Sequence, residues 1–214
     1  MHMIDIKRIK SIGFDVDGTL YRVPEPMSID VSKEVIAIAA KELGRSDDDF
    51  AEEYVARREE YRSNTMTLNS FGLDGERIFQ AVFDRTPLER YVKKDERLIA
   101  MLVALKKKYR LFIISNGSGV QIGRKLVALG VNAKWFDPIV SCYEKGWVKP
   151  EPAPFLTAIE SLNLKPEEIV YVGDRTDVDM DAAKAVGMKT IFVGGSYFGA
   201  DASCETVYDV EQLL

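Results

Sequence analysis

Histidine is almost absent from this sequence, whose 214 residues contain a single one, His2. This scarcity excludes catalytic triads that need histidine and zinc sites that are built on several histidines. Cysteine is nearly as rare: Cys142 and Cys204 lie far apart and outside any Cys-x-x-Cys pair, so we interpret both as reduced residues. If the protein is an enzyme, its chemistry must therefore come from carboxylates, lysine, hydroxyl groups or a hard metal ion.

Long apolar segments are also missing. The longest unbroken apolar run is Leu98–Leu105, eight residues, whereas a membrane-spanning helix needs about 20. The N-terminal residues lack the apolar segment of a signal peptide, so we expect a cytoplasmic protein without a membrane partner. The formal net charge is −5, from 29 Lys and Arg against 34 Asp and Glu. A mildly acidic chain of this kind is not expected to bind nucleic acid.

Short apolar segments rich in Ile, Val and Phe recur along the chain and alternate with helical patterns. This alternation predicts an α/β fold, a doubly wound parallel sheet with helices on both of its faces. The segments show little polar alternation, which is typical of strands that are buried on both sides. We expect strands at 12–16, 111–114, 139–140, 169–172 and 190–193, and helices between them at 95–108, 120–129, 154–163 and 178–186.

One long stretch after the first strand shows helical spacing and no strand pattern. Helices are expected at 30–43, 46–62 and 75–83, and Gly44 is placed to end the first of them. We therefore predict an inserted helical subdomain at residues 21–95. Residues 1–20 and 96–214 are then expected to form the core that contains the sheet.

Three of the expected strands end in polar side chains. These are Asp15 and Asp17 at the end of the first, Ser115 at the end of the second and Asp174 at the end of the fourth. Because ligands of open parallel sheets bind at the carboxyl ends of the strands, these side chains are expected to converge at one edge. Alternation along a strand would place Asp15 and Asp17 on the same face. Three carboxylates without a nearby histidine suit Mg²⁺, which prefers oxygen ligands.

Four short motifs make the sequence similar to the haloacid dehalogenase superfamily. They are Phe-Asp-Val-Asp-Gly-Thr-Leu at 14–20, Ile-Ser-Asn-Gly at 114–117, Val-Lys-Pro-Glu-Pro at 148–152 and Val-Gly-Asp-Arg-Thr-Asp-Val-Asp at 172–179. The order of the motifs resembles that of the superfamily. The helical insertion between the first two resembles the phosphatase branch that carries a helical cap. The resemblance implies a Rossmann-like catalytic core and Mg²⁺-dependent hydrolysis of a small soluble phosphate ester.

The resemblance also implies a role for each motif acid. Asp15 would attack phosphorus and form an aspartyl phosphate. Asp17 would protonate the leaving oxygen and later activate water, and its backbone carbonyl would bind Mg²⁺. Asp15 and Asp174 would complete the protein ligands, with Asp179 contributing directly or through water. Whether Asp177 shares that last role is left open.

The resemblance further implies a phosphate-binding group. Ser115 and the backbone amides near Asn116 and Gly117 would hold the phosphate oxygens. Lys149 would neutralise the charge between Asp15 and the phosphate. The partner would be a small phosphorylated metabolite, and phosphoglycolate, sugar phosphates and nucleoside monophosphates are all open as substrates. A monomer and a homodimer are both open.

Three other functions are compatible with parts of this pattern. A phosphomutase of the same superfamily would pass on the phosphoryl group instead of hydrolysing it. A phospho-acceptor regulatory domain also gathers acids, a hydroxyl and a lysine around Mg²⁺, but it would need no helical insertion. A dehalogenase is disfavoured because that branch has no acid at the position of Asp17.

The helical insertion is expected to close over the site and to exclude bulky substrates, as lids commonly do.

Overall fold

The computed structural model describes residues 8–61 and 63–214, so His2 lies outside the described residues. The described chain divides into two compact units. One contains the residues up to Val23 together with Val92–Leu214, and the other is Pro24–Tyr91. Residues 21–23 and 92–95 thus group with the unit that contains the sheet, rather than with the helical unit in which the sequence pattern placed them.

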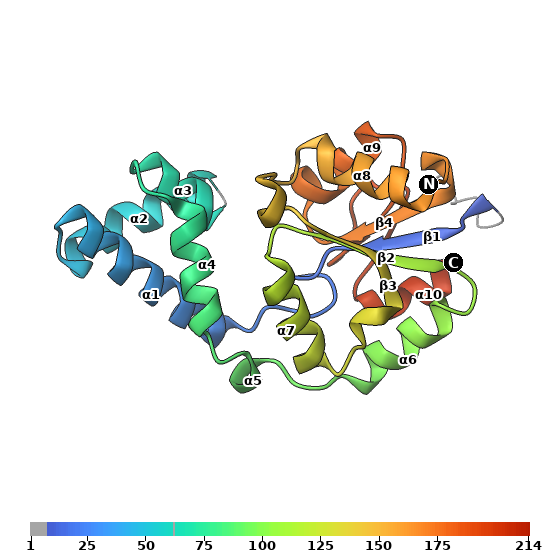
Figure 1. Cartoon of the computed structure of the whole chain (residues 1–214), viewed down its shortest axis with the longest axis horizontal. Helices are drawn as coiled ribbons and strands as arrows, with labels where there is room; N and C mark the ends of the chain where they lie inside the picture. The colour runs from blue at the N-terminus through green and yellow to red at the C-terminus, as the bar shows by residue number, and fades with distance from the viewer. Residues whose placement is uncertain (1–7, 62) are drawn as a thin grey trace. The chain divides into compact units, whose positions relative to one another are not determined.

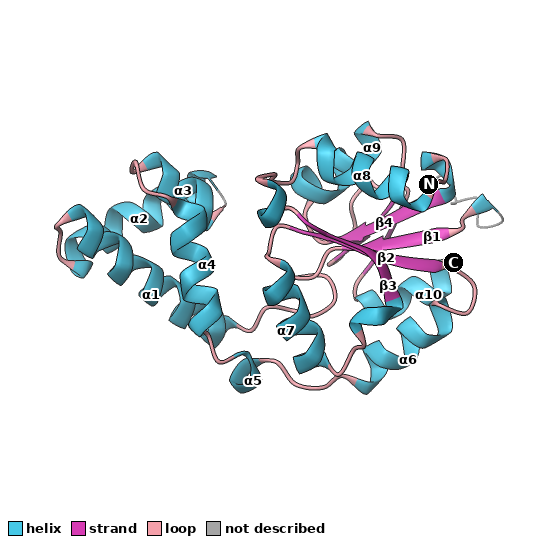
Figure 2. Ribbon diagram, viewed as in Figure 1, coloured by secondary structure: helices cyan, strands magenta, loops and turns pink. Residues whose placement is uncertain are grey.

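The first unit contains a six-stranded sheet in the order β3-β2-β1-β4-β5-β6, and every neighbouring pair is parallel. Figure 2 shows β3, β2, β1 and β4 in this order. This arrangement confirms the predicted α/β fold. The sixth strand was not expected, because its three residues are too short to give a sequence pattern. The strands are β1 Ser11–Phe14, β2 Arg110–Ser115, β3 Phe136–Ser141, β4 Ile169–Gly173, β5 Lys189–Val193 and β6 Ala202–Cys204.

Helices cover both faces of this sheet. In Figures 1 and 2, α8 and α9 lie on one side of it, and α6 and α10 on the other. Two N-caps fix helix starts after loops: Asp95 accepts from Leu98 N, and Ser118 accepts from Gln121 N. The helices of this unit are α6 Glu96–Leu105, α7 Gly119–Leu129, α8 Pro152–Leu162, α9 Asp181–Ala185 and α10 Val210–Leu213, with short 3-10 turns at 133–135, 143–145, 166–168 and 207–209 and a π-helical turn at Thr176–Met180.

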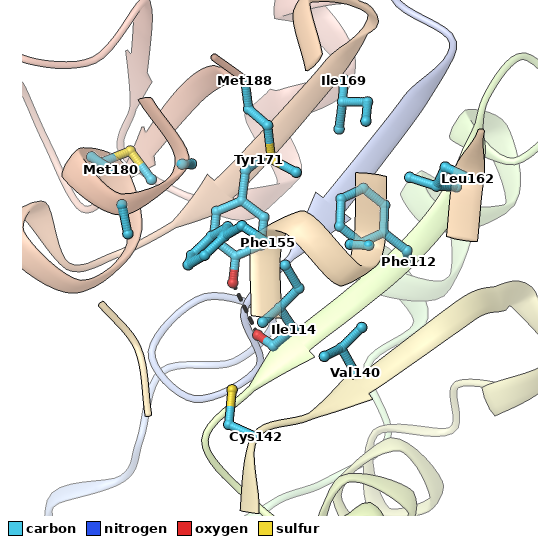
Figure 3. Close-up of a cluster of buried hydrophobic side chains, with 13 residues drawn as sticks. Phe112, Ile114, Val140, Cys142, Phe155, Leu162, Ile169, Tyr171, Met180 and Met188 are labelled. Carbon is cyan, nitrogen blue, oxygen red and sulfur yellow. Dashed lines mark hydrogen bonds between the residues drawn. The ribbon is translucent and has the colours of Figure 1, made fainter. Parts of the chain in front are cut away.

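Aromatic side chains pack between the sheet and α8 (Figure 3). Tyr171 of β4 meets Phe155 of α8 edge to face, with ring centroids 5.1 Å apart. Its hydroxyl donates to the carbonyl of Ile114, 2.9 Å away, so the buried phenol keeps a polar partner. Burial of one such side chain stabilises the fold by about 1.5–3 kcal/mol. This packing ties β4 to the end of β2, where the polar residues begin.

The second unit is built from helices around a small apolar core. Its helices are α1 Glu25–Leu43, α2 Asp47–Tyr61, α3 Asn64–Ser70, α4 Gly75–Arg85 and α5 Leu88–Tyr91. Helix α1 starts earlier than the apolar spacing indicated, because a proline near its start suits the first turn. It ends as expected at Gly44, whose φ is 67°. The short helices α3 and α5 were not expected from the sequence.

None of the helices in the described part of the chain combines the length and the apolar composition that crossing a membrane would need. Both cysteines are free thiols, and Cys142 is buried.

Candidate active site

The carboxyl ends of the three central strands carry the candidate site. Strand β1 lies between β2 and β4, and Phe14, its last residue, pairs with Ile113 on one side and Val172 on the other. The chain reverses its winding direction across β1, which is where ligands bind in this kind of sheet. Asp15 is the first residue after β1, and its amide still donates to the carbonyl of Val172, 2.9 Å away. The sheet thus places Asp15 at its edge, buried between two neighbours.

Three of the predicted acids form one cluster. Asp15, Asp174 and Asp179 each offer a carboxylate oxygen, and these oxygens lie within 4.8 Å of one another. Two glycines make the approach possible. A Cβ at Gly18 would lie 2.1 Å from Asp174 Oδ2, and one at Gly173 would lie 2.5 Å from Asp179 Cβ. No larger residue could stand at either position without moving an acid of the cluster.

Asp179 reaches the cluster because of the local helix geometry. It lies in the π-helical turn Thr176–Met180 and is fully buried. Its Oδ2 accepts a hydrogen bond of 3.2 Å from the amide of Arg175. Asp177 is instead exposed beside Arg175, at 3.8 Å between Nη2 and Oδ2. Of the two acids left open by the sequence, the structure therefore brings only Asp179 to the cluster.

Lys149 inserts its ammonium group among these acids. Its Nζ lies 2.8 Å from Asp15 Oδ1 and 2.7 Å from Asp179 Oδ1, and the side chain is 3% exposed. It also donates to the hydroxyl of Tyr171 over 3.2 Å. The backbone amide of Lys149 donates to Asn116 Oδ1 over 2.8 Å, which ties the third motif to the second. One lysine thus bridges two of the three buried carboxylates.

Burial and neighbouring charges together shift the pKa values of Asp15, Asp174 and Lys149. Burial raises the pKa of Asp15 to about 7, and Asp179 and Asp17 add to the rise although Lys149 opposes it. Burial likewise raises the pKa of Asp174 to about 6, with a further contribution from Asp179. Burial disfavours the charged form of Lys149, but Asp15 and Asp179 outweigh it and hold the pKa of the ammonium well above its usual value. A cation would therefore be favourable beside the carboxylates.

The second motif spans the end of β2, with Ile114 and Ser115, and the turn after it, with Asn116 and Gly117. Ser115 is buried, and its Oγ accepts from the amide of Gly117 over 3.2 Å. Ser141, the last residue of β3, donates to the carbonyl of Gly117 over 2.9 Å. Together with the hydrogen bond that the Lys149 amide donates to Asn116 Oδ1, these contacts tie the turn to β3 and to the third motif.

Asp17 does not follow the strand geometry that the sequence suggested. Strand β1 ends at Phe14, so alternation does not carry Asp17 into the carboxylate cluster. Its Oδ2 lies 2.5 Å from Lys125 Nζ, and its Oδ1 accepts from the hydroxyl of Tyr21 over 2.5 Å. Sequence reasoning missed both partners. The sequence contains one signal for Lys125: its helical spacing places this charged residue on the same buried face of α7 as Ile122 and Leu126.

Thr19 is a further neighbour that the sequence did not single out. Its Oγ1 donates to Asp174 Oδ1 over 3.2 Å, and the side chain is buried. This bond orients one acid of the cluster from the turn that follows β1.

The sequence profile of the haloacid dehalogenase-like hydrolase family matches residues 9–187, which include every residue of the site. The chain belongs to this family. It is 32% identical to a glyceraldehyde 3-phosphate phosphatase from Methanopyrus kandleri, over 86% of this chain and 83% of that protein. It is also 29% identical to a phosphoglycolate phosphatase from Aquifex aeolicus, over 85% and 83% of the two chains.

A solved structure supports the same assignment. The crystal structure of a haloacid dehalogenase phosphatase from Thermococcus onnurineus matches with a TM-score of 0.70 and 27% identity, over 96% of this chain and 97% of that one. The family and the enzyme class expected from the four motifs are thereby confirmed: the enzyme is a phosphatase of the haloacid dehalogenase superfamily.

Proposed function

We propose that the enzyme is a Mg²⁺-dependent phosphomonoester hydrolase that acts on a small phosphate ester through an aspartyl phosphate at Asp15. The observation that carries the proposal is the buried cluster of Asp15, Asp174 and Asp179 with Lys149 set among them. A nucleophile, a cation and metal-ligating oxygens are thus gathered at the edge where this fold binds ligands.

The donor set fits a hard divalent ion. Asp15, Asp174 and Asp179 present oxygen atoms only, close together, and glycines clear the space on two sides. Mg²⁺ is commonly held by a few carboxylates together with water and substrate phosphate. When bound, the ion would neutralise charge on the transferring phosphoryl group. A contribution from the backbone carbonyl of Asp17 stays a prediction from the family resemblance.

The residues of the chain can then be given consecutive roles. A carboxylate oxygen of Asp15 forms a bond to phosphorus while the ester P–O bond breaks, and its electron pair leaves with the substrate oxygen. Asp17 gives that oxygen a proton. In the second step Asp17 takes a proton from water, the water oxygen bonds to phosphorus, and the aspartyl P–O bond breaks with its electron pair returning to the carboxylate of Asp15. Proton transfers of this kind contribute about 10²–10⁴-fold to the rate.

The remaining site residues would bind the phosphoryl group. Ser115 ends β2, and Asn116 and Gly117 follow it, at the same sheet edge as Asp15. Lys149 would neutralise charge that develops on the phosphoryl oxygens, because it already lies 2.8 Å from the proposed nucleophile. Fixed donors and cations aimed at developing charge are the usual source of such stabilisation.

The substrate is proposed to be a small phosphorylated metabolite of the kind for which the two relatives are named, glyceraldehyde 3-phosphate or phosphoglycolate. Phosphate release from a panel of small esters, measured with Mg²⁺, tests this proposal. A phosphomutase would instead give an isomeric ester without free phosphate, so the same assay separates the two activities. A regulatory domain would retain its phosphate and show no turnover.

Cytoplasmic location and a monomeric or dimeric state also stay predictions.

Mg²⁺ should stabilise the protein more strongly at higher pH. Folding raises the pKa of Asp15 to about 7 and that of Asp174 to about 6, above the value of about 4 in an unfolded chain. Between these values the folded metal-free protein binds more protons than the unfolded one, so its stability falls as the pH rises. A metal ion must displace these protons, and its binding therefore tightens over the same range.

The measurement is the shift in melting temperature caused by Mg²⁺ at about pH 5 and about pH 7.5. We expect the larger shift at the higher pH, and loss of turnover in excess chelator. Ca²⁺ should bind but inhibit, because its looser coordination would misalign the attack. Equal shifts at both pH values would contradict the proposed ligands, and full activity in chelator would contradict the metal requirement.

The helical unit is proposed to select the substrate, as its place between the first and second motifs implies. We expect the enzyme to hydrolyse a small phosphate ester with a much higher kcat/KM than a phosphopeptide, because a lid would exclude the peptide chain. The comparison uses the best ester of the panel and a phosphoserine peptide under the same conditions. Equal values of kcat/KM for both would show that the helical unit does not restrict access.

A further inference from the structure

Asp17 is held by two side chains that no motif contains. The hydroxyl of Tyr21 donates to Oδ1 over 2.5 Å, and the ammonium of Lys125 lies 2.5 Å from Oδ2. Both oxygens of one carboxylate are thus engaged, from two different parts of the chain. Both partners belong to the same compact unit as Asp17.

Lys125 is a buried charge on a largely apolar face of α7, where Gln121 is the other buried polar side chain. Its side chain is 2% exposed, and its neighbours on that face of α7 include Ile122 and Leu126. Removing an ammonium group from water is unfavourable unless a partner offsets it. A buried apolar side chain at this position would avoid the unfavourable burial of a charge, so packing alone does not explain why a lysine is present. The ion pair with Asp17 gives the lysine a role at this position.

The turn that contains Asp17 also fixes the position of Tyr21. The amide of Gly18 donates to the carbonyl of Tyr21 over 3.0 Å, and Gly18 has a φ of 87°, which favours glycine. The amide of Leu20 donates to the carbonyl of Val16 over 3.0 Å. Tyr21 as a whole residue is 8% exposed. Burial and the neighbouring Asp17 raise the pKa of the phenol, so it keeps its proton and donates.

We propose that Lys125 and Tyr21 are positioning residues that fix the carboxyl group of Asp17 in the orientation needed for proton transfer at the phosphoryl site. This inference rests on the proposed function, in which Asp17 protonates the leaving oxygen. Neither residue needs to touch the substrate. Each acts by restricting the rotation of Asp17, one from α7 and one from the turn after β1.

The test compares two esters whose leaving groups differ in their need for a proton. 4-Nitrophenyl phosphate releases a stable phenolate, whereas an alkyl phosphate must release an alcohol that needs protonation. We expect Lys125→Met to lower kcat/KM for the alkyl ester by about 10²-fold and to change that for the aryl ester by less than about threefold. Tyr21→Phe should act in the same direction with a smaller effect, and it preserves the packing of the ring. Lys125→Arg, which keeps the cation, should recover much of the loss.

Action through Asp17 can be separated from a general weakening of the fold. In an Asp17→Asn background, Lys125→Met should change the ratio of the two kcat/KM values no further, because the group that it positions is gone. Two matched controls lie at the amino ends of the strands. Lys189→Met removes a lysine that pairs with Asp201 at 3.2 Å, and Tyr109→Phe removes a hydroxyl that donates to the carbonyl of Leu214. Both controls should leave the ratio unchanged.

Two results would overturn this inference and leave the proposed function intact. Equal losses for both esters in Lys125→Met and in Tyr21→Phe would indicate a structural role. A rise in kcat/KM for the alkyl ester would show that the two side chains hold Asp17 away from the reaction. A wild-type enzyme that hydrolyses neither ester would overturn the proposed function, and this inference with it.

Discussion

Replacement of Asp15 by asparagine should lower turnover by about 10⁴-fold or more, the scale expected when a covalent nucleophile is lost. An amide of nearly the same shape cannot attack phosphorus. The fold should survive, because burial raises the pKa of Asp15 to about 7 and so already disfavours its charged form. A neutral side chain removes that unfavourable charge. Steady-state release of phosphate and thermal unfolding of the variant measure the two expectations.

Asp181→Asn provides a matched control for this experiment. Asp181 follows the π-helical turn and contacts the hydroxyl of Tyr197 at 3.4 Å, outside the carboxylate cluster. Its replacement should leave turnover within a few-fold of the wild type, as for most surface substitutions. Retention of activity within tenfold of wild type by Asp15→Asn would remove this residue from the role of nucleophile.

Replacement of Lys149 by methionine should damage both stability and turnover. The variant leaves Asp15 and Asp179 buried without the ammonium that lies 2.8 and 2.7 Å from them. Removal of one partner from a buried ion pair costs about 3–5 kcal/mol. Without that cation the pKa of Asp15 rises further, so less of the nucleophile is ionised. Loss of a group that stabilises developing charge should lower kcat by about 10²–10³-fold.

Denaturant unfolding of the metal-free protein measures the first effect, and kinetics on the best small ester measure the second. Lys10→Met is the control, because Lys10 forms a surface pair with Glu168 at 2.6 Å and its side chain is 59% exposed. Such pairs contribute about 0–1 kcal/mol. Mg²⁺ should restore part of the stability of Lys149→Met, since it supplies positive charge to the same acids. A loss of stability no greater than that of the control would show that the buried ion pair is not important for folding.

Local sequence patterns were enough to predict most of the sheet. Segments such as 111–114 and 169–172 are apolar throughout, and a strand buried on both faces needs that composition. Ala202–Cys204 and Asn64–Ser70 were missed because short elements depend on contacts with the rest of the fold rather than on their own periodicity. The boundaries of the helical unit moved by a few residues for a similar reason, since Tyr21 is held by Asp17 of the core.

The sequence by itself determined the family and brought Asp15, Asp174 and Lys149 forward as candidates, because four motifs in order leave few alternatives. The tertiary structure decided which of the later acids joins the cluster, since a π-helical turn buries Asp179 and leaves Asp177 exposed. It also decided the surroundings of Asp17. Lys125 is 108 residues away along the chain, and a pairing at that separation has no local pattern. It exists because the folded sheet brings the turn after β1 against α7.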